Sequence, residues 1–209
     1  MRLFITLITL SLSLTLFSQN YGSKIDPSNG FSQKLKEASS KTNTIVCNFD
    51  QTKNMAVLAK PNISKGMFFY QKEQNICLEY TSPEGNLIVM SGGKFKIITD
   101  GKKSVVDMKA NPMMRQMGSM LSGCMTGNLE LFGNESNTEY FETSSCYTVL
   151  ITPTNKRVKK YLQNIVLVFD KNDMTLNSML MQENTTDYTK YDFHKKKLNS
   201  EIETDKFKI

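Results

Sequence analysis

The sequence predicts a mainly β protein with some α-helix, folded as an incomplete (half-open) antiparallel β-barrel of about 10–11 strands that is covered by lid helices. Apolar and polar residues alternate with a period of two through most of the chain beyond residue 44, which is typical of half-buried strands. Turn-forming stretches such as Pro83-Glu84-Gly85, Gly92-Gly93 and Asp100-Gly101 separate the alternating runs, so neighbouring strands form hairpins. A twisted sheet with this many strands curls.

The first predicted helix covers residues 29–42. It places Phe31, Leu35 and Ala38 on one face, and Ser28 precedes it as a candidate N-cap. The period of two begins directly after this helix, so we expect the helix to pack on the sheet.

The strands are expected to follow one another in meander order. They cover residues 44–51, a long extended stretch at 55–71 interrupted at Pro61, then 76–81, 87–90, 94–99, 103–108, 128–132, 138–142, 147–152, 163–170, 174–183 and 187–193, with a helical turn within 155–161. Proline within a strand pattern indicates a bulge or an edge. The basic run from Lys195 to Lys197 is interpreted as a solvated face.

The second predicted helix lies in the middle of the chain, at residues 111–125, and is rich in methionine. Its apolar stripe has a helical period and consists of Met113, Met114, Met117, Met120, Leu121, Cys124 and Met125, with Pro112 suited to the first helical position and Ser122 on the polar face. Methionine is long, unbranched and polarisable, and it adapts to surfaces of varying shape. One interpretation is ordinary core packing. The other is a lid over a cavity for lipid chains.

Alternation along the strands also selects the concave face of the sheet. The residues on that face are expected to be Phe49, Phe68, Tyr70, Ile76, Leu78, Tyr80, Phe95 and Ile97. Asn48, Glu79 and Lys96 lie on the opposite face. The concave side chains either form an ordinary core or line a cavity that binds lipid.

The chain has four cysteines, Cys47, Cys77, Cys124 and Cys146, which allow three disulfide connectivities. Strand parity points Cys47 inward and Cys77 outward, so these two are not expected to bridge. The sequence leaves the redox state of the four open. With a single histidine and no C-x-x-C pair, we expect no metal site.

The start of the chain predicts a signal peptide over residues 1–18. Arg2 supplies the positive charge, an apolar run continues to Phe17, and cleavage is expected near Ser18. The apolar run is short for a bilayer span, which needs about 20 residues. Residues 19–209 are enough for a single domain with a substantial core. We therefore expect a soluble, exported protein.

Composition argues against several classes of function. The net charge is +6, from 26 basic and 20 acidic residues, and the excess is spread along the chain. This excess allows weak attraction to anionic membranes or acidic partners. The sequence lacks a motif of basic residues interspersed with aromatic residues, which would indicate binding to nucleic acid. His194 has no serine, cysteine or aspartate arranged near it in a way that suggests nucleophilic catalysis. The carboxylates Asp50, Glu79 and Asp170 are expected at strand ends or on the outer face, and no two of them suggest a general acid–base pair. We expect no enzyme and no cofactor.

The sequence resembles the LolA-type outer-membrane lipoprotein carrier family, whose members are periplasmic chaperones. The resemblance rests on the order and spacing of several short motifs. The motifs are Phe49-Asp50-Gln51, the run from Ser64 to Tyr70, the run from Glu79 to Pro83, the run from Ser91 to Lys94, the mid-chain helix, Ile151-Thr152-Pro153, Phe169-Asp170 and Tyr191-Asp192-Phe193. The sequence departs from the family pattern at Lys72-Glu73, where Arg-Pro is frequent. It also departs at Leu78 and Ile97, where tryptophan is frequent, and at Gly92-Gly93, which replaces an Asp-Gly turn.

The resemblance implies transport without chemistry. Such a carrier is a monomer of the periplasm that takes acylated lipoproteins from an inner-membrane ABC lipoprotein-releasing complex and passes them to an outer-membrane acceptor. Lys72 stands where the family arginine has a role in this transfer, so Lys72 is a candidate transfer residue. Two alternatives remain open. One is a carrier of another amphiphile, such as a glycolipid or fatty acid, and the other is a lipid-free envelope interaction protein.

Overall fold

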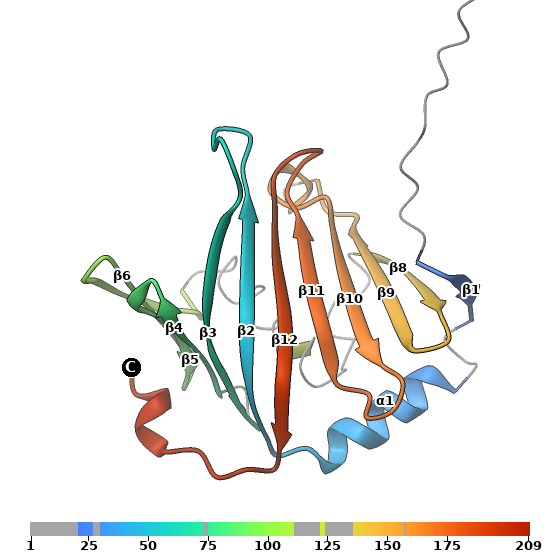
Figure 1. Ribbon diagram of the computed structural model, residues 1–209, viewed down its shortest axis with the longest axis horizontal. Helices are drawn as coiled ribbons and strands as arrows, with labels where there is room; N and C mark the ends of the chain where they lie inside the picture. The colour runs from blue at the N-terminus through green and yellow to red at the C-terminus, as the bar shows by residue number, and fades with distance from the viewer. Residues whose placement is uncertain (1–20, 27–29, 73–74, 111–121, 124–135, 157) are drawn as a thin grey trace, which may run out of the picture.

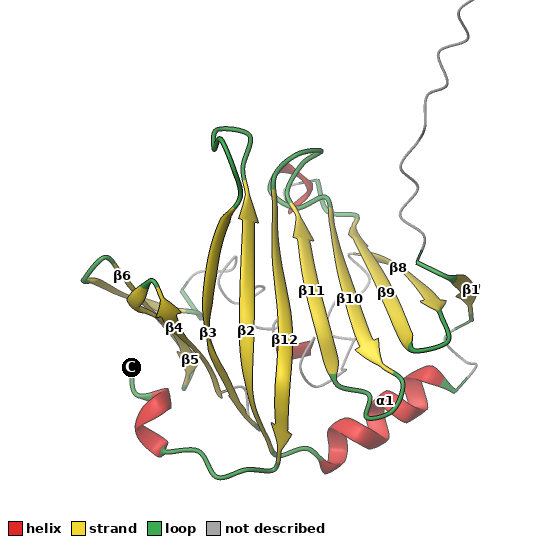
Figure 2. Ribbon diagram, viewed as in Figure 1, coloured by secondary structure: helices red, strands yellow, loops and turns green. Residues whose placement is uncertain are grey.

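The computed structural model describes residues 21–26, 30–72, 75–110, 122–123, 136–156 and 158–209. Twelve strands form one antiparallel sheet in the order β1-β8-β9-β10-β11-β12-β2-β3-β4-β5-β6-β7. Figure 1 shows that the sheet curls without closing, and Figure 2 shows how strongly strands dominate the fold. The expected half-open antiparallel barrel with a helix is therefore confirmed, and the described residues form twelve strands where about ten or eleven were expected.

The bounds of the elements are as follows. The strands are β1 (Ser23–Ile25), β2 (Thr44–Asn54), β3 (Asn62–Gln71), β4 (Asn75–Ser82), β5 (Glu84–Ser91), β6 (Lys94–Thr99), β7 (Lys102–Asp107), β8 (Ser136–Glu142), β9 (Cys146–Pro153), β10 (Asn164–Asp170), β11 (Leu176–Gln182) and β12 (Tyr188–Leu198). The helix α1 covers Phe31–Lys41, and the short 3-10 helices η2 and η3 cover Val158–Lys160 and Thr204–Phe207.

Two strand predictions need correction. The extended stretch expected at 55–71 is a strand only from Asn62, because the chain turns where Leu58 N–H donates to the Met55 carbonyl (2.9 Å) and Pro61 has no N–H to continue the ladder. The last strand, expected to end at residue 193, continues through the basic run as far as Leu198. A bulge between His194 and Lys197, with Lys195 at φ 54°, lets the strand continue to pair with β2.

The helix α1 packs against the first part of the sheet through aromatic contacts. The Phe31 ring centroid lies 4.7 Å from that of Tyr147, 5.9 Å from Tyr140 and 6.0 Å from Phe169. Leu35, one helical turn later, is also buried. This helix therefore covers one end of the concave side of β8–β10, as Figure 1 shows for its position beneath those strands.

A second apolar cluster lies on the convex face. Phe69, Cys77 and Val89 are buried there beneath Phe207, with Ile202 and Ile209 packed at the margin. The C-terminal segment crosses β4 and β5, and its Lys206 ammonium forms an ion pair of 2.8 Å with Glu79. The parity prediction placed Glu79 and Lys96 on this face correctly. The sequence did not indicate that the end of the chain covers it.

Three further expectations lie outside the described residues: the signal peptide at 1–18, the cap Ser28 and the strand at 128–132. Across the described parts of the chain, no helix is both long and apolar enough to cross a bilayer.

Candidate functional site

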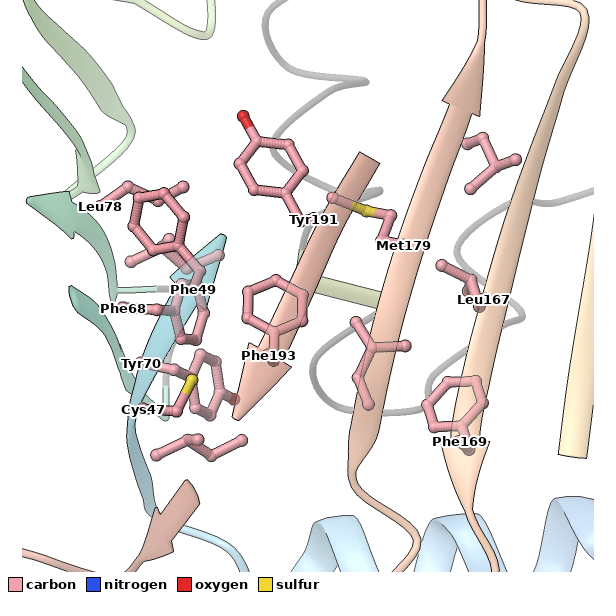
Figure 3. Packing of buried hydrophobic residues seen from close by; sticks show 14 of the residues in the cluster. Cys47, Phe49, Phe68, Tyr70, Leu78, Leu167, Phe169, Met179, Tyr191 and Phe193 are labelled. Carbon is pink, nitrogen blue, oxygen red and sulfur yellow. The ribbon is translucent and has the colours of Figure 1, made fainter. Parts of the chain in front are cut away.

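The concave face of the sheet carries a continuous layer of apolar side chains. The structure brings together the residues that alternation selected: Phe49, Phe68, Tyr70, Ile76, Leu78, Tyr80 and Phe95 are buried in one cluster, and Ile97 packs at its margin. Strand alternation accounts for this arrangement, because every second side chain on β2, β3 and β4 points to the same side. Figure 3 shows several of them facing side chains from β10, β11 and β12 across the curl.

Aromatic rings join the two sides of this layer. Phe49 meets Tyr80 edge-on at 5.1 Å between ring centroids, and it lies 5.9 Å from Tyr191. Phe68 meets Phe193 at 5.4 Å, and Phe193 stacks on Tyr191 at 6.2 Å. Edge-to-face and offset contacts are the favoured geometries for such rings. The layer is therefore a packed aromatic surface rather than a set of separate side chains.

Gly66 makes room for the central ring. A Cβ at this position would lie 2.3 Å from the Glu79 carbonyl oxygen and 2.6 Å from the Phe49 ring. Gly66 pairs with Phe49 across β2 and β3, so the Phe49 ring lies directly over the glycine backbone. Phe49 is fully buried as a result.

One polar group is enclosed in this apolar layer. Gln51 Nε2 donates a hydrogen bond of 2.6 Å to the Tyr191 hydroxyl, and the Tyr80 side chain also interacts with both residues. Burial raises the pKa of Tyr80, and it raises the pKa of Tyr191 well above its usual value. Both phenols therefore stay neutral at physiological pH, and the face presents no charge at this point.

A small hollow lies between described side chains of the concave face. A cavity of about 10 Å³ is lined by Ile45, Cys47, Phe68, Thr175, Leu176, Phe193 and Lys196. This volume is about what one water molecule needs. A larger hollow of about 430 Å³ lies elsewhere, where β2 begins, among polar residues that include Asn43, Gln71 and Asn199.

The sequence matches the family described as "Outer membrane lipoprotein carrier protein LolA" over residues 40–209. The chain belongs to the LolA family. A comparison with curated proteins finds no match. The fold resembles an uncharacterized conserved protein from Thermus thermophilus (TM-score 0.52, 6% identity, 88% of this chain and 94% of that chain). It also resembles a chain of the MucA/MucB complex of Pseudomonas aeruginosa (TM-score 0.53, 11% identity, 88% of this chain and 61% of that chain). At sequence identities this low, the structural likeness shows a shared fold alone.

Lys72 stands at the position where the LolA resemblance expects a transfer arginine. Its backbone N–H donates to the Asn43 carbonyl at 2.8 Å, and its ammonium donates to the Ser40 carbonyl at 3.0 Å. Ser40 belongs to the last turn of α1, whose partial negative charge attracts a cation. The Lys72 side chain is thus bound to the C-terminal end of the helix.

The cysteines of this LolA-family chain follow strand parity. Cys47 is in the concave cluster and Cys77 is in the convex one, so the prediction that they do not bridge is confirmed. Cys47, Cys77 and Cys146 are free thiols, whereas Cys124 lies outside the described residues. Burial raises the pKa of Cys47 and of Cys77 to about 12. Within the described parts of the chain, no group of acidic, histidine or cysteine side chains could hold a metal ion.

The expected lid residues Met113, Met114, Met117, Met120 and Leu121 lie outside the described residues. Of that segment the structure describes Ser122 and Gly123, which are helical and buried. The stripe pattern put Ser122 on the polar face of the helix. The structure instead buries Ser122.

Sequence reasoning missed the contribution of the closing strands to the concave layer. Their buried members include Ile165, Leu167, Phe169, Met179, Tyr191 and Phe193. The signal was present in residues 189–193, where the buried residues Thr189, Tyr191 and Phe193 alternate with Lys190 and Asp192. What the sequence lacked was the sheet order that places β12 beside β2.

Proposed function

We propose that this LolA-family protein is a periplasmic carrier that shields the acyl chains of lipoproteins on its concave face. It takes the lipoproteins from an inner-membrane ABC releasing complex and delivers them to an outer-membrane acceptor. The single observation that supports this proposal is the continuous apolar concave layer, built from both halves of a sheet that remains open at its edges. Such a protein binds and releases, and it carries out no chemical step.

Energetics explain why such a protein needs this layer. Each methylene withdrawn from water contributes about 0.8 kcal/mol, so an acyl anchor of many methylenes does not cross an aqueous compartment unprotected. Aromatic and aliphatic side chains such as Phe68, Leu78 and Phe193 take the place of water around the acyl chain. An unpaired charge facing an acyl chain would be costly. The Lys196 ammonium, which lies beside the cavity next to Phe68 and Phe193, has a hydrogen-bond partner in Asn177 Oδ1.

The ring contacts within the layer give the carrier a means of release. The cavity of about 10 Å³ beside Phe68 and Phe193 is too small for an acyl chain, so cargo that enters at this point displaces side chains that now contact one another. The free energy of those contacts is subtracted from the free energy of cargo binding. A carrier that rebuilds its own core when empty therefore holds its cargo with limited affinity, and the methionines of 111–125 suit such a rearrangement.

The cargo can be identified from protein purified from its native envelope under mild conditions. Lipid extraction and mass spectrometry should detect acylated lipoproteins that copurify with the carrier. Recovery of glycolipids or free fatty acids without lipoproteins would replace the lipoprotein assignment with the alternative of a carrier for another amphiphile.

Two neighbouring isoleucines test the binding face. Ile97 packs at the margin of the concave cluster, and Ile98 is the next residue of β6, pointing to the opposite face; both are partly buried. Ile97→Glu should weaken binding of a fluorescent acyl probe about tenfold or more, because a carboxylate would be desolvated by the ligand. Ile98→Glu is the matched control and should bind as the unchanged protein does. Equal binding by both variants, each shown to be folded by circular dichroism, would contradict the proposal.

The direct contacts between aromatic rings, such as Phe68 with Phe193, also favour a second candidate, a lipid-free envelope protein whose sheet serves to dock a partner. This candidate expects no acyl-probe binding at all by the unchanged protein. It also expects a copurifying protein that carries no acyl group. The mass-spectrometry experiment therefore separates the two candidates.

A further inference from the structure

The connection between β2 and β3 presents apolar side chains to solvent. Val57 is 84% exposed and Leu58 is 43% exposed, and Ile63, at the start of β3, is 60% exposed. Lys53 and Lys60 flank them and are also exposed. Figure 1 shows this connection projecting from the end of the sheet that is opposite α1. Exposed apolar side chains grouped at one tip are characteristic of interaction sites.

A second exposed group lies at the same end of the sheet. Strand register places Asn54 beside Tyr188, Tyr188 beside Gln182, and Gln182 beside Asn164. The connection between β9 and β10, which leads into Asn164, therefore opens at the end where β2 finishes. It contains Tyr161, which is 71% exposed.

The β9–β10 connection is also basic. It carries exposed Lys156, Lys159 and Lys160, and within the described residues none of these lysines forms an ion pair. The same holds for Lys53 and Lys60 on the neighbouring connection. Unpaired lysines beside exposed apolar side chains form an amphipathic surface.

The β2–β3 tip is held in place by the intervening β11–β12 connection. Ala56 N–H donates to Asp187 Oδ1 at 2.6 Å, and Asn54 Nδ2 donates to the Thr186 carbonyl at 2.8 Å. On its other side, Gln163 N–H donates to the Gln182 carbonyl at 2.7 Å. The three connections thus form one continuous rim, in which Asp187 is occupied by hydrogen bonds. Glu183 is the other carboxylate on the β11–β12 connection, and it is half-buried.

We propose that this rim docks the protein on an anionic lipid bilayer. The docking rim consists of Lys53, Val57, Leu58, Lys60, Ile63, Lys156, Lys159, Lys160 and Tyr161. Aliphatic side chains at the tip enter the interfacial region, Tyr161 lies at headgroup depth, and the lysines contact anionic headgroups. Lysines lie on both sides of the apolar tip. This arrangement matches an anionic bilayer, in which negatively charged headgroups lie beside an apolar interior, better than it matches the groove of a protein partner.

This inference goes beyond cargo binding, and it does not depend on the nature of the cargo. None of the rim residues belongs to the concave cluster. Loss of docking and loss of acyl-chain binding can therefore be observed separately, in the same purified protein.

Sedimentation with vesicles tests the proposal directly. The full chain should bind vesicles of phosphatidylcholine mixed with phosphatidylglycerol, and binding should weaken as salt rises. Val57→Ser with Leu58→Ser should reduce binding about tenfold or more, since two apolar side chains no longer enter the interface. Lys159→Gln with Lys160→Gln should also reduce it, by about 25-fold at about fivefold per lysine. Leu198→Ser is the matched control: Leu198 is 37% exposed at the opposite end of the sheet, and its loss should leave binding unchanged.

Fluorescence provides a second measurement, because the chain has no tryptophan. Leu58→Trp should shift its emission to shorter wavelength on addition of anionic vesicles, whereas Leu198→Trp should not. All variants carry the same N-terminus, so any contribution of residues 1–20 is common to them. An unshifted Leu58→Trp spectrum, or wild-type sedimentation by the Val57→Ser, Leu58→Ser variant, overturns the proposal. So does the finding that the unchanged protein does not bind anionic vesicles.

Discussion

At the residue scale, single positions decide how closely the concave layer packs. Gly66 allows the Phe49 ring to lie against the β3 backbone, and Gln51 supplies a partner for the hydroxyl of Tyr191. A buried hydroxyl without such a partner costs about 1–3 kcal/mol. The enclosed polar group therefore stabilises one arrangement of the rings without adding charge to the face.

The close approach at Gly66 leads to a quantitative prediction. Gly66→Ala should lower the free energy of unfolding by about 1–3 kcal/mol, because its Cβ would overlap the Glu79 carbonyl and the Phe49 ring. Gly101→Ala is the control: a Cβ there meets nothing within 4 Å, and it costs only left-handed strain of about 1–2 kcal/mol. Denaturant unfolding measures both.

A double-mutant cycle separates the ring from the carbonyl at this site. If the Phe49 ring is part of the overlap, Phe49→Leu combined with Gly66→Ala should cost less than the sum of the two single changes. Strict additivity would show that the Glu79 carbonyl alone accounts for the loss.

At the element scale, the end of the chain behaves as a cover for the convex face. The segment that contains η3 is held by the burial of Phe207 and by the Lys206–Glu79 ion pair. The Lys206 ammonium also lies 5.1 Å from the centroid of the Phe69 ring. Because this ion pair is partly exposed, the apolar contacts contribute most of the stabilisation.

Loss of that anchor should expose the thiol beneath it. We expect Phe207→Ala to make Cys77, which is fully buried, reactive toward a thiol reagent, while Cys47 on the other face stays protected. Peptide mapping by mass spectrometry measures modification at each cysteine. Thr204→Ala, an exposed change in the same short helix, should leave Cys77 protected. A protected Cys77 in Phe207→Ala would mean that the sheet itself, and not the segment, buries the thiol.

At the scale of the whole molecule, buried thiols and phenols make the free energy of unfolding fall at alkaline pH. The pKa of Cys47 rises from 9.0 to about 12 on folding, and that of Cys77 rises likewise. The folded state therefore holds these protons more tightly than the unfolded state. Their contribution to stability is complete below pH 9 and is lost as the pH rises toward 12. The pKa values of Tyr80 and Tyr191 are also raised, so they act in the same direction at higher pH.

This linkage predicts a steep decline in the free energy of unfolding above about pH 9. Replacing both cysteines, as Cys47→Ala with Cys77→Ala, should flatten the decline by several kcal/mol at most, at about 1.4 kcal/mol per pKa unit for each thiol. Chemical denaturation at a series of pH values, with the variant as control, measures the difference. An equally steep decline in the variant would assign the effect to other groups.

The amino-acid sequence alone was enough to predict the class of fold, most of the strands and the side of the sheet to which each residue points. It placed Cys47 and Phe49 inward and Cys77 outward correctly, because Cβ direction alternates along any strand whatever its neighbours are. Which strands meet could be learned only from the folded molecule. The pairing of β12 with β2, the closure of the concave layer around Tyr191 and the burial of Phe207 all join residues far apart in the chain. Such contacts depend on sheet order and on the fit of side chains in space, neither of which a local pattern of residues contains.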